Sequence, residues 1–458
     1  MEVKKSNMKI LMLPWLAHGH LSPFVELSKR LAKRNIHIYI CSTPVNLNSI
    51  KKRITQKYSN SIELIELNLP SLPDLPPQYH TTNGLPPHLM TTLKKAYEMS
   101  TPQFSNILST LLPDLVVYDF NQNWAAEIAS FRNIPAVQFL PVGASIMSFG
   151  LHMMKNLGKE NFPFHEIYLR DYEIIKLQGA GGSKGNDDFS DRNRFLQAIE
   201  RSCGILLIKS CKEIEGKFMD FLSVLSGKKV VPVGPLVQES YLDDGDQEND
   251  EEMEIIRWLD KKEKGSVVFV SFGSEYFLTE EERNEIARGL ELSNVNFIWV
   301  IRFPFGEKIN IQEALPEGFS ERIGNRGKIV EEWAPQAKIL KHSSTGAFVS
   351  HCGWNSITES MKFGIPIIAM PMQIDQPLNA RLVEAIGVGL EVIRGDEGNL
   401  QSEEMAKVIR KVLVDESGEG VRRKAKELSE KLEMKGDEEI DILVEELVEL
   451  CKNSNGQC

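Results

Sequence analysis

Apolar and polar positions along the first part of the chain follow two different periods. Short apolar runs have the length and composition of buried strands. Such strands are predicted at 8–14, 37–41, 114–119 and 136–140. Residues 23–34 have the spacing of an amphipathic helix, and residues 15–22 before it have the character of a loop. The alternation of strands and helices predicts a parallel sheet covered by helices on both faces.

The same alternation starts again in the second half of the chain. Strands are predicted at 266–271, 296–301, 347–350 and 365–370. Helices are predicted over 279–293, which begins Thr-Glu-Glu-Glu, and from about 355 to 363. A second doubly wound domain is the simplest explanation, so the fold class is α/β with two Rossmann-like parallel-sheet domains.

Polar segments mark the domain boundaries. Residues 238–254 are acidic and contain almost nothing that could enter a core, which is typical of a linker. The predicted domains are therefore 1–237, 255–435 and a C-terminal helix at 436–458 that packs back on the N-terminal domain. Residues 179–188 are glycine-rich and polar, and they are predicted to form a loop inside the first domain. The charged tail at 417–452 is predicted to be helical, with apolar docking positions at Leu443, Val444, Leu447, Val448 and Leu450.

Composition excludes several classes of function. The chain has 458 residues, of which 42% are hydrophobic and 26% are charged, as in a globular protein. A net charge of −11 leaves no excess of cations for nucleic acid or an anionic membrane surface. No segment approaches the roughly 18 apolar residues of a membrane span, and the N-terminus lacks a signal-peptide pattern. We therefore expect a cytoplasmic monomer that binds small molecules.

Cysteines and acidic pairs give no sign of a metal site. The six cysteines are scattered without zinc-site spacing, and we interpret them as reduced thiols, most of them small buried side chains. An Asp-x-Asp pattern occurs at Asp244 and Asp246, inside the acidic linker, where a solvated charge run is the better interpretation. The fingerprints of dinucleotide-binding proteins, phosphate-loop proteins and serine hydrolases are also absent from the sequence. No metal and no cofactor are expected.

The densest chemical signal lies between Trp333 and Gln376. It contains Trp-Ala-Pro-Gln, then Ser350-His-Cys-Gly-Trp-Asn-Ser, then Glu359, then Asp375-Gln376. The middle motif falls where a strand turns into a helix, so free backbone N–H groups and the positive end of a helix dipole suit a diphosphate there. An indole at Trp333, in a loop stiffened by proline, can stack on a planar base.

This segment strongly resembles the donor-binding signature of plant UDP-dependent glycosyltransferases. The resemblance covers the whole signature in order and spacing, and the rest of the chain fits the two-domain GT-B arrangement of that family, with two sheets facing a cleft. It implies that uracil stacks on Trp333, that Glu359 accepts from ribose hydroxyls, and that Gln376 goes with glucose as the donor sugar. The UDP-sugar-binding residues implied in this way are Ser274, Trp333, Ala334, Gln336, His351, Gly353, Trp354, Asn355, Ser356, Glu359, Asp375 and Gln376.

A general base is expected from the N-terminal domain. His18 and His20 follow the first strand, and Asp119 ends a later strand of the same sheet. An imidazole can take a proton from an acceptor hydroxyl at neutral pH, and a carboxylate on its other ring nitrogen would fix the tautomer. The family's Gly-His-x-x-Pro pattern, present at residues 19–23, implies that His20 is the base and that His18 is a loop residue.

Together these parts predict an inverting, metal-independent transfer of glucose from UDP-glucose to a small-molecule hydroxyl. Several N-terminal segments resemble the branch of the family that extends existing glycosides, with β-1,6 linkage favoured over β-1,2. Candidate acceptor-pocket residues are Trp15, Phe120, Gln122 and Ser145. Pro141 departs from relatives that place a hydroxyl residue there to bind the donor sugar. Two alternatives stay open: direct glucosylation of an aglycone, and a non-catalytic UDP-sugar-binding protein.

Overall fold

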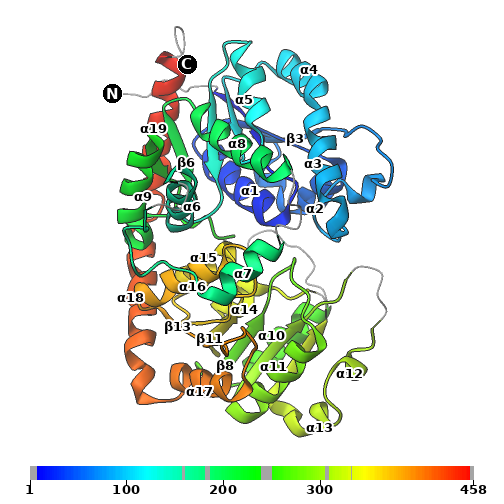
Figure 1. Cartoon of the computed structure of the whole chain (residues 1–458), viewed down its shortest axis with the longest axis vertical. Helices are drawn as coiled ribbons and strands as arrows, with labels where there is room; N and C mark the ends of the chain where they lie inside the picture. The colour runs from blue at the N-terminus through cyan, green and yellow to red at the C-terminus, as the bar shows by residue number, and fades with distance from the viewer. Residues whose placement is uncertain are drawn as a thin grey trace. The chain divides into compact units, whose positions relative to one another are not determined.

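The computed structural model divides the chain into two compact units. It describes residues 8–156, 160–180, 186–238, 250–304, 309–331 and 333–453. Unit 1 comprises Met1–Asn161, Ser183–Leu236 and Asp437–Cys458, and unit 2 comprises Phe162–Gly182 and Val237–Gly436. Each unit is a parallel sheet flanked by helices (Figure 1). The two parallel-sheet domains predicted from the sequence are confirmed.

Unit 1 contains a sheet of seven strands in the order β3-β2-β1-β4-β5-β6-β7, all parallel. The strands are β1 (Lys9–Leu13), β2 (His37–Ser42), β3 (Ile62–Glu66), β4 (Leu115–Tyr118), β5 (Ala136–Leu140), β6 (Ile205–Ile208) and β7 (Lys229–Pro232). The helices are α1 (His18–Ala32), α2 (Pro44–Ile50), α3 (Met90–Met99), α4 (Thr101–Leu111), α5 (Asn123–Ser130), α6 (Ala144–Asn156), α8 (Asn186–Glu200), α9 (Lys212–Ser226) and α19 (Glu438–Asn453). Short 3-10 helices lie at Lys51–Arg53, Gln56–Tyr58, Pro77–Tyr79 and Pro87–Leu89.

Unit 2 contains a sheet of six parallel strands in the order β10-β9-β8-β11-β12-β13. The strands are β8 (Val267–Ser271), β9 (Asn296–Ile301), β10 (Gly327–Glu331), β11 (Thr345–Ser350), β12 (Ile367–Ala369) and β13 (Gly389–Glu391). The helices are α7 (Asp171–Ala180), α10 (Asp250–Asp260), α11 (Glu280–Ser293), α12 (Ile311–Ala314), α13 (Phe319–Ile323), α14 (Gln336–Lys341), α15 (Trp354–Phe363), α16 (Gln376–Ala385), α17 (Ser402–Leu413) and α18 (Glu419–Lys435). Short 3-10 helices lie at Gly324–Arg326 and Glu416–Gly418.

The continuous apolar character of the central strands follows from burial on both faces. In β1, Ile10 and Met12 belong to one core cluster while Leu11 and Leu13 belong to another, because successive side chains of a strand point to opposite faces. In β8, Val268 and Val267 are divided between two clusters in the same way. Each sheet is thus the middle layer of a three-layer unit.

The C-terminal helix α19 belongs to unit 1. Leu443 and Leu447 are fully buried in the core cluster that also holds residues of β1 and α1. Asp437, one residue before α19, forms ion pairs with Arg30 and Arg34. Both of these arginines are close to the end of α1. Apolar burial and charge pairing therefore hold the end of the chain against its beginning.

Two local predictions differ from the structure. Helix α1 begins at His18 rather than at residue 23, so Pro23 lies inside the helix, and Leu21 donates its backbone N–H to the Ala17 carbonyl at 2.9 Å. Residues 250–254 of the predicted linker are helical, and residues 239–249, which include Asp244 and Asp246, lie outside the described residues.

The predicted loop at 179–188 is shorter in the structure, because residues 179–180 end α7 and residues 186–188 begin α8; its residues 181–185 lie outside the described residues. Among the cysteines, Cys41, Cys211 and Cys352 are buried free thiols, and Cys451 is a partly buried one. Cys203 is disulfide-bonded, so the expectation of a reduced thiol is wrong at that position.

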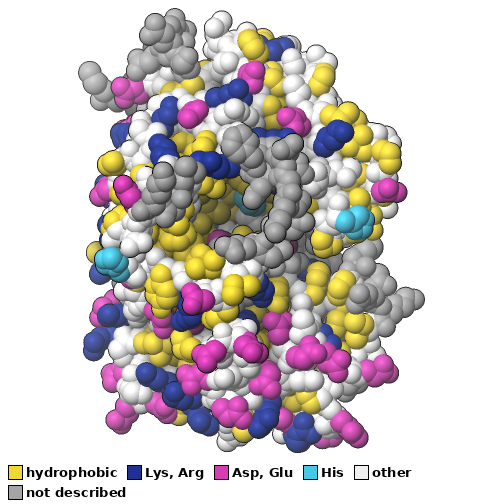
Figure 2. Space-filling model, in the orientation of Figure 1, with side chains coloured by type: hydrophobic (Ala, Val, Ile, Leu, Met, Phe, Trp, Pro, Cys, Tyr) yellow, Lys and Arg dark blue, Asp and Glu magenta, His cyan; other side chains and the backbone are white. Residues whose placement is uncertain are grey.

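The surface carries charges of both signs. Figure 2 shows Asp and Glu side chains interspersed with Lys and Arg over the face of unit 2 that it presents. Exposed pairs such as Arg288 with Glu403 and Lys407 with Glu404 contribute to this pattern. Within the described ranges, no helix is both long enough and apolar enough to cross a membrane.

Candidate functional site

His20 and Asp119 form a hydrogen-bonded pair although 99 positions separate them. His20 Nδ1 lies 2.9 Å from Asp119 Oδ2, and the carboxylate side chain is completely buried while the imidazole is 21% exposed. A carboxylate on Nδ1 fixes the neutral tautomer with its proton on Nδ1, which leaves Nε2 to accept a proton. The structure thus brings together the two residues that the sequence predicted to act as a catalytic pair.

The sheet topology explains why these two residues meet. Strands β1 and β4 are neighbours at the point where the strand order of unit 1 reverses, and Leu13 is in register with Tyr118. The chain segments that follow them therefore leave the same edge of the sheet side by side. His20 lies in the first turn of α1 after β1, and Asp119 directly follows β4.

Backbone donors hold Asp119 in place. Its Oδ2 accepts the N–H of Trp15 at 3.0 Å, and its Oδ1 accepts the N–H of Phe120 at 2.7 Å. These bonds satisfy a carboxylate that has no access to water. The two backbone hydrogen bonds therefore hold the Asp119 carboxylate in position to accept from the His20 ring.

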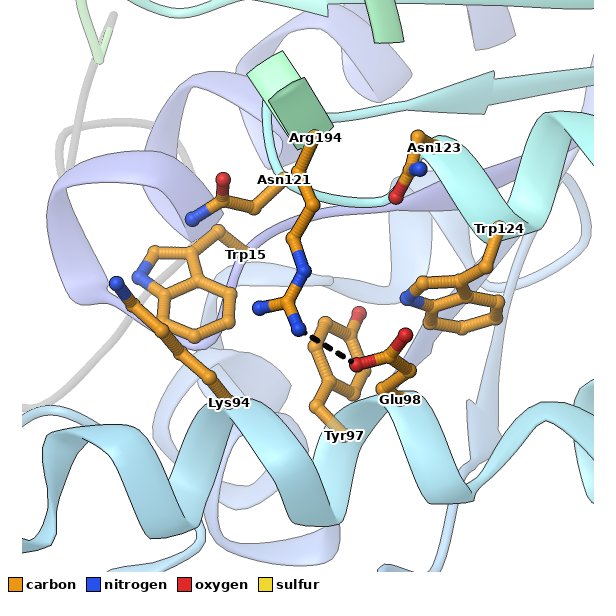
Figure 3. Close-up of a pocket in the computed structure, with 8 residues that line it drawn as sticks. All are labelled: Trp15, Lys94, Tyr97, Glu98, Asn121, Asn123, Trp124 and Arg194. Carbon is orange, nitrogen blue, oxygen red and sulfur yellow. Dashed lines mark hydrogen bonds and ion pairs between the residues drawn. The ribbon is translucent and has the colours of Figure 1, made fainter. Parts of the chain in front are cut away.

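Two aromatic side chains, Phe120 and Trp15, lie near His20 and Asp119. The Phe120 ring centroid lies 5.1 Å from that of His20 and 6.3 Å from that of Trp15. Trp15 also lines a small pocket in which Arg194 reaches Glu98 at 3.1 Å (Figure 3). The other residues that line this pocket are Lys94, Tyr97, Asn121, Asn123 and Trp124.

Gln122 and Ser145, also predicted for the acceptor pocket, do not line that small pocket. Both are completely buried, and the Gln122 carboxamide and the Ser145 hydroxyl have no hydrogen-bond partner in the structure. Buried polar groups of this kind are normally satisfied by water or a ligand. Of the four residues predicted for the acceptor pocket, the structure places Phe120 beside His20 and Trp15 beside Phe120, whereas Gln122 and Ser145 lie in the interior.

In unit 2 the N-terminus of α15 is built around His351. Strand β11 ends at Ser350, which is in register with Ser271 at the end of β8, so the loops after these strands are adjacent. Gly353 is the N-cap of α15. A methyl group added at Gly353 or Gly273 would lie 2.4 or 2.6 Å from His351 Nε2. The imidazole therefore fits between two glycine backbones, and Gly273 has a positive φ of 78° as well.

His351 is uncharged at neutral pH. Burial lowers the pKa of its imidazole to about 4, although the Ser271 backbone opposes this shift. Its Nδ1 has no hydrogen-bond partner. A diphosphate at this helix terminus would be met by backbone N–H groups and the positive end of the helix dipole.

The start of α14 is tied to α15. Gln336 Nε2 donates to Glu359 Oε2 at 2.8 Å and to Ser356 Oγ at 3.2 Å. Trp333, just before this helix, is 50% exposed, and Ala334 is buried. A half-exposed indole has ring surface available for the predicted stacking on a planar base.

Gln376, the first residue of α16, is buried, and the oxygen of its side-chain amide is hydrogen-bonded. Its Oε1 accepts the backbone N–H groups of Met372 and Gln373 at 2.9 and 3.0 Å, which leaves its amide nitrogen to donate to a ligand. Asp375 accepts from Asn379 Nδ2 at 3.1 Å, and the same nitrogen donates to the Cys352 carbonyl at 2.9 Å. Asn379 thus connects the 375–376 segment to the loop that carries His351.

The remaining donor-site predictions lie in the same unit. Ser274 and Asn355 are partly exposed, and Trp354 is buried at the first turn of α15. Two residues were missed from the sequence. Gly273 could have been found from its place directly after a strand, and Asn379 from its i,i+4 spacing to Asp375.

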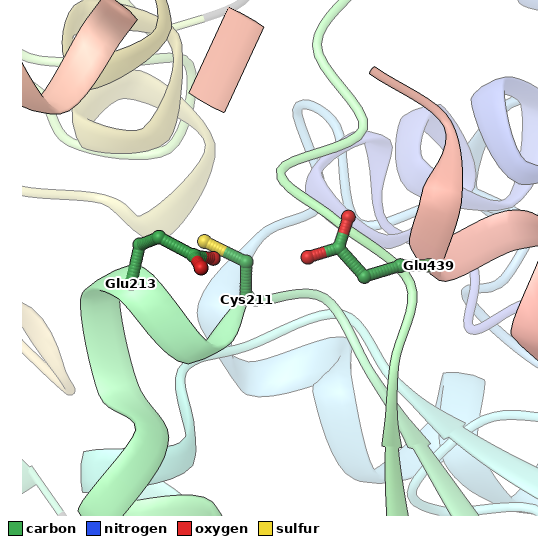
Figure 4. A group of neighbouring side chains, drawn as sticks. All are labelled: Cys211, Glu213 and Glu439. Atoms are coloured by element: carbon green, nitrogen blue, oxygen red, sulfur yellow. The ribbon is translucent and has the colours of Figure 1, made fainter. Parts of the chain in front are cut away.

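One group of potential metal ligands occurs among the described residues, and it lies in unit 1. Ligand atoms of Cys211, Glu213 and Glu439 lie within 4.8 Å of one another (Figure 4). In the absence of a metal, burial raises the pKa of the Cys211 thiol.

Comparison with known proteins adds independent information. A family model for the N-terminal domain of glycosyltransferases matches residues 6–238, and the model for UDP-glucuronosyl and UDP-glucosyl transferases matches residues 244–429. The chain is 55% identical to UDP-glucosyltransferase 29 of Panax ginseng, covering 100% of both chains. It is 52% identical to the beta-D-glucosyl crocetin beta-1,6-glucosyltransferase of Gardenia jasminoides, covering 96% of this chain and 98% of that one.

Solved structures agree in fold. A complex of a UDP-glucosyltransferase from Polygonum tinctorium, described as capable of glucosylating indoxyl, matches with a TM-score of 0.79 and 27% identity. The match covers 99% of this chain and 100% of that chain. The similarity therefore extends over both units.

Proposed function

Because the chain belongs to the UDP-glucuronosyl and UDP-glucosyl transferase family, we propose that it moves glucose from UDP-glucose to a sugar hydroxyl of a small-molecule plant glycoside. The single observation that carries the catalytic part of this proposal is the pairing of His20 with the buried Asp119. A binding protein without catalysis would gain nothing from a carboxylate that orients an imidazole. That pairing favours the enzyme over the non-catalytic alternative.

The transfer begins with removal of a proton from the acceptor. His20 Nε2 takes the proton of the acceptor hydroxyl, and the Nδ1–H donates to Asp119, which stabilises the imidazolium that forms. The acceptor oxygen forms a bond to the anomeric carbon as the bond from that carbon to the UDP oxygen breaks. The electron pair leaves with UDP, and this single displacement inverts an α-linked donor to a β-glucoside.

Unit 2 supplies the groups that receive the leaving diphosphate. The N-terminus of α15, with Asn355 and Ser356 in its first turn, offers neutral donors where negative charge develops. Trp333 stacks on the uracil, and Glu359, already held by Gln336, accepts from the ribose. Asp375 and the free amide nitrogen of Gln376 bind the glucose hydroxyls.

A second sugar as acceptor is favoured by the Gardenia relative, whose name describes glucosylation of a glucosyl group with β-1,6 linkage. At 52% identity across nearly the whole chain, that chemistry is our first choice here. The β-1,2 linkage and direct glucosylation of an aglycone are the alternatives.

No metal is required by this mechanism, because the protein itself supplies the donors that meet the diphosphate. Full turnover after treatment with EDTA is the expected result. The cytoplasmic location and the monomeric state remain predictions.

Turnover of UDP-glucose with a panel of aglycones and their monoglucosides tests the proposal. We expect the monoglucosides to be the better acceptors, with a product whose β-1,6 linkage is visible by NMR. Preferred use of aglycones would establish the alternative acceptor class, and absence of transfer to the whole panel would contradict the enzyme assignment.

A further inference from the structure

Residues 162–182 lie between two segments of unit 1 in the sequence, but they belong to unit 2. The segment carries α7, which Figure 1 shows among the helices α15 and α16 of that unit. The sequence pattern gave no indication of this placement, because the charged residues that anchor the segment are far apart in the chain. The anchor lies on α16, the helix that begins with Gln376.

Four charged side chains form the anchor. Arg381 of α16 donates through Nη2 to Glu173 Oε1 at 2.7 Å and through Nη1 to Glu391 Oε2. Arg170 donates to both oxygens of Glu391, at 2.6 and 3.1 Å. The Arg170 backbone N–H also donates to Glu173 Oε2 at 2.7 Å. Two positive and two negative groups therefore compensate one another.

This anchor is buried to an unusual degree for charged groups. The side chains of Arg381, Glu173 and Glu391 are at most 4% exposed, and Arg170 is 21% exposed. The Tyr168 ring lies 5.0 Å from the Arg381 guanidinium carbon. Exposed ion pairs contribute little to geometry, but a buried arginine held by two carboxylates can take only one orientation.

Helix α16 connects this anchor to the donor residues. Two residues before Arg381, Asn379 donates to Asp375 and to the carbonyl of Cys352, next to His351. Glu384 of the same helix accepts the backbone N–H of Glu391 at 3.0 Å. The position of α16 therefore determines where Asp375, Gln376 and the Cys352 carbonyl lie.

We propose that residues 162–180 are a positioning element of the donor site: Glu173 fixes Arg381, and through it α16 and the loop after β11. This inference rests on the proposed function, because it assigns Gln376 and the His351 loop to the donor. It adds that a segment outside the donor signature determines donor affinity. The acceptor-side residues His20 and Asp119 are in unit 1 and take no part in it.

Glu173→Gln tests this positioning role. The amide cannot balance the charge of Arg381, which then keeps only Glu391, already shared with Arg170. Helix α16 therefore loses one of its two ionic contacts, and displacement of binding groups by about 1 Å can cost up to roughly 100-fold. We expect the dissociation constant of UDP and the KM for UDP-glucose to rise by roughly 10- to 100-fold, with the acceptor KM unchanged. UDP binding is measured by calorimetry without an acceptor.

A double variant separates positioning from stability. Glu173→Gln combined with Arg381→Met removes one charge of each sign and leaves Arg170 paired with Glu391, so the melting temperature should recover toward the wild-type value. UDP affinity should stay reduced, because α16 is still not tied to α7. Arg288→Met, which breaks an exposed pair in the same unit, is the matched control and should leave UDP affinity unchanged.

Wild-type UDP affinity in the folded double variant would overturn the inference and leave the proposed function intact. Failure of the wild-type protein itself to bind UDP would instead contradict the proposed function. The two results are distinguishable in one set of titrations.

Discussion

Substitution of Gly353 by alanine tests how closely the His351 ring packs against the backbone in the proposed donor-binding loop. A β-carbon at this position would lie 2.4 Å from His351 Nε2, whereas ordinary contacts between such atoms are about 3.5 Å or longer. The imidazole, which also meets the Gly273 backbone, would have to move by about 1 Å. Gly353 has a φ of −60°, which alanine adopts without strain, so the substitution isolates the steric overlap.

The expected consequence is a loss of donor affinity. Displacement of about 1 Å in a binding site can cost up to roughly 100-fold, so the dissociation constant of UDP should rise by roughly 10- to 100-fold. This corresponds to about 1.4 to 2.7 kcal/mol. Isothermal titration of Gly353→Ala with UDP measures it, and the melting temperature shows whether the variant is folded.

Two further variants complete the experiment. Gly420→Ala, on α18 of the same unit, places its β-carbon in open space and should bind UDP as the wild type does. In a His351→Ala background the overlap is absent, so Gly353→Ala should cost much less UDP affinity there than it does in the wild-type protein. Wild-type UDP affinity of Gly353→Ala would refute the idea that the ring is confined by the two glycines.

Two other predictions concern the same unit. Trp333→Ala should weaken UDP binding by about 1–3 kcal/mol, because the half-exposed indole is the proposed stacking surface for uracil, and calorimetry with an unchanged melting temperature checks it. The pKa of His351 is lowered on folding from 6.5 to about 4, so its contribution to stability is complete above pH 6.5 and is lost as the pH falls toward 4. At pH 5 the loss is about 2 kcal/mol relative to pH 7.5, measured by urea denaturation, and it should be absent in His351→Gln.

The predictable parts of the molecule are those with local signals. Strands such as 296–301 were predicted from continuous apolar runs, and they form because parallel strands are buried on both faces. The pairing of His20 with Asp119 was predictable despite its sequence separation, because both residues follow strands of one sheet. The predicted donor residues other than Ser274 lie within one segment of the sequence, 333–376, where the resemblance to the family's signature pointed to them.

Other features depend on contacts between residues that are far apart in the sequence, and the spacing of apolar positions does not reveal such contacts. Residues 162–182 join unit 2 through Glu173 and Arg381, two charged residues that look like ordinary surface positions in the sequence. The same holds for Glu215, which is completely buried and accepts the backbone N–H groups of Ala144 and Ser145 at the start of α6. Burial raises the pKa of that carboxyl group. A buried charge can be recognised only when its distant partner is known.

The role of His20 can be tested most directly by comparing turnover and UDP binding in one preparation of His20→Ala. Loss of the proposed base should lower turnover by roughly 10²–10⁴-fold, while the dissociation constant of UDP stays at the wild-type value because the proposed nucleotide site lies in unit 2. His18→Ala, two positions earlier on the same helix, should keep near wild-type turnover. Equal losses of turnover and UDP affinity in His20→Ala, or wild-type turnover without this imidazole, would contradict the account.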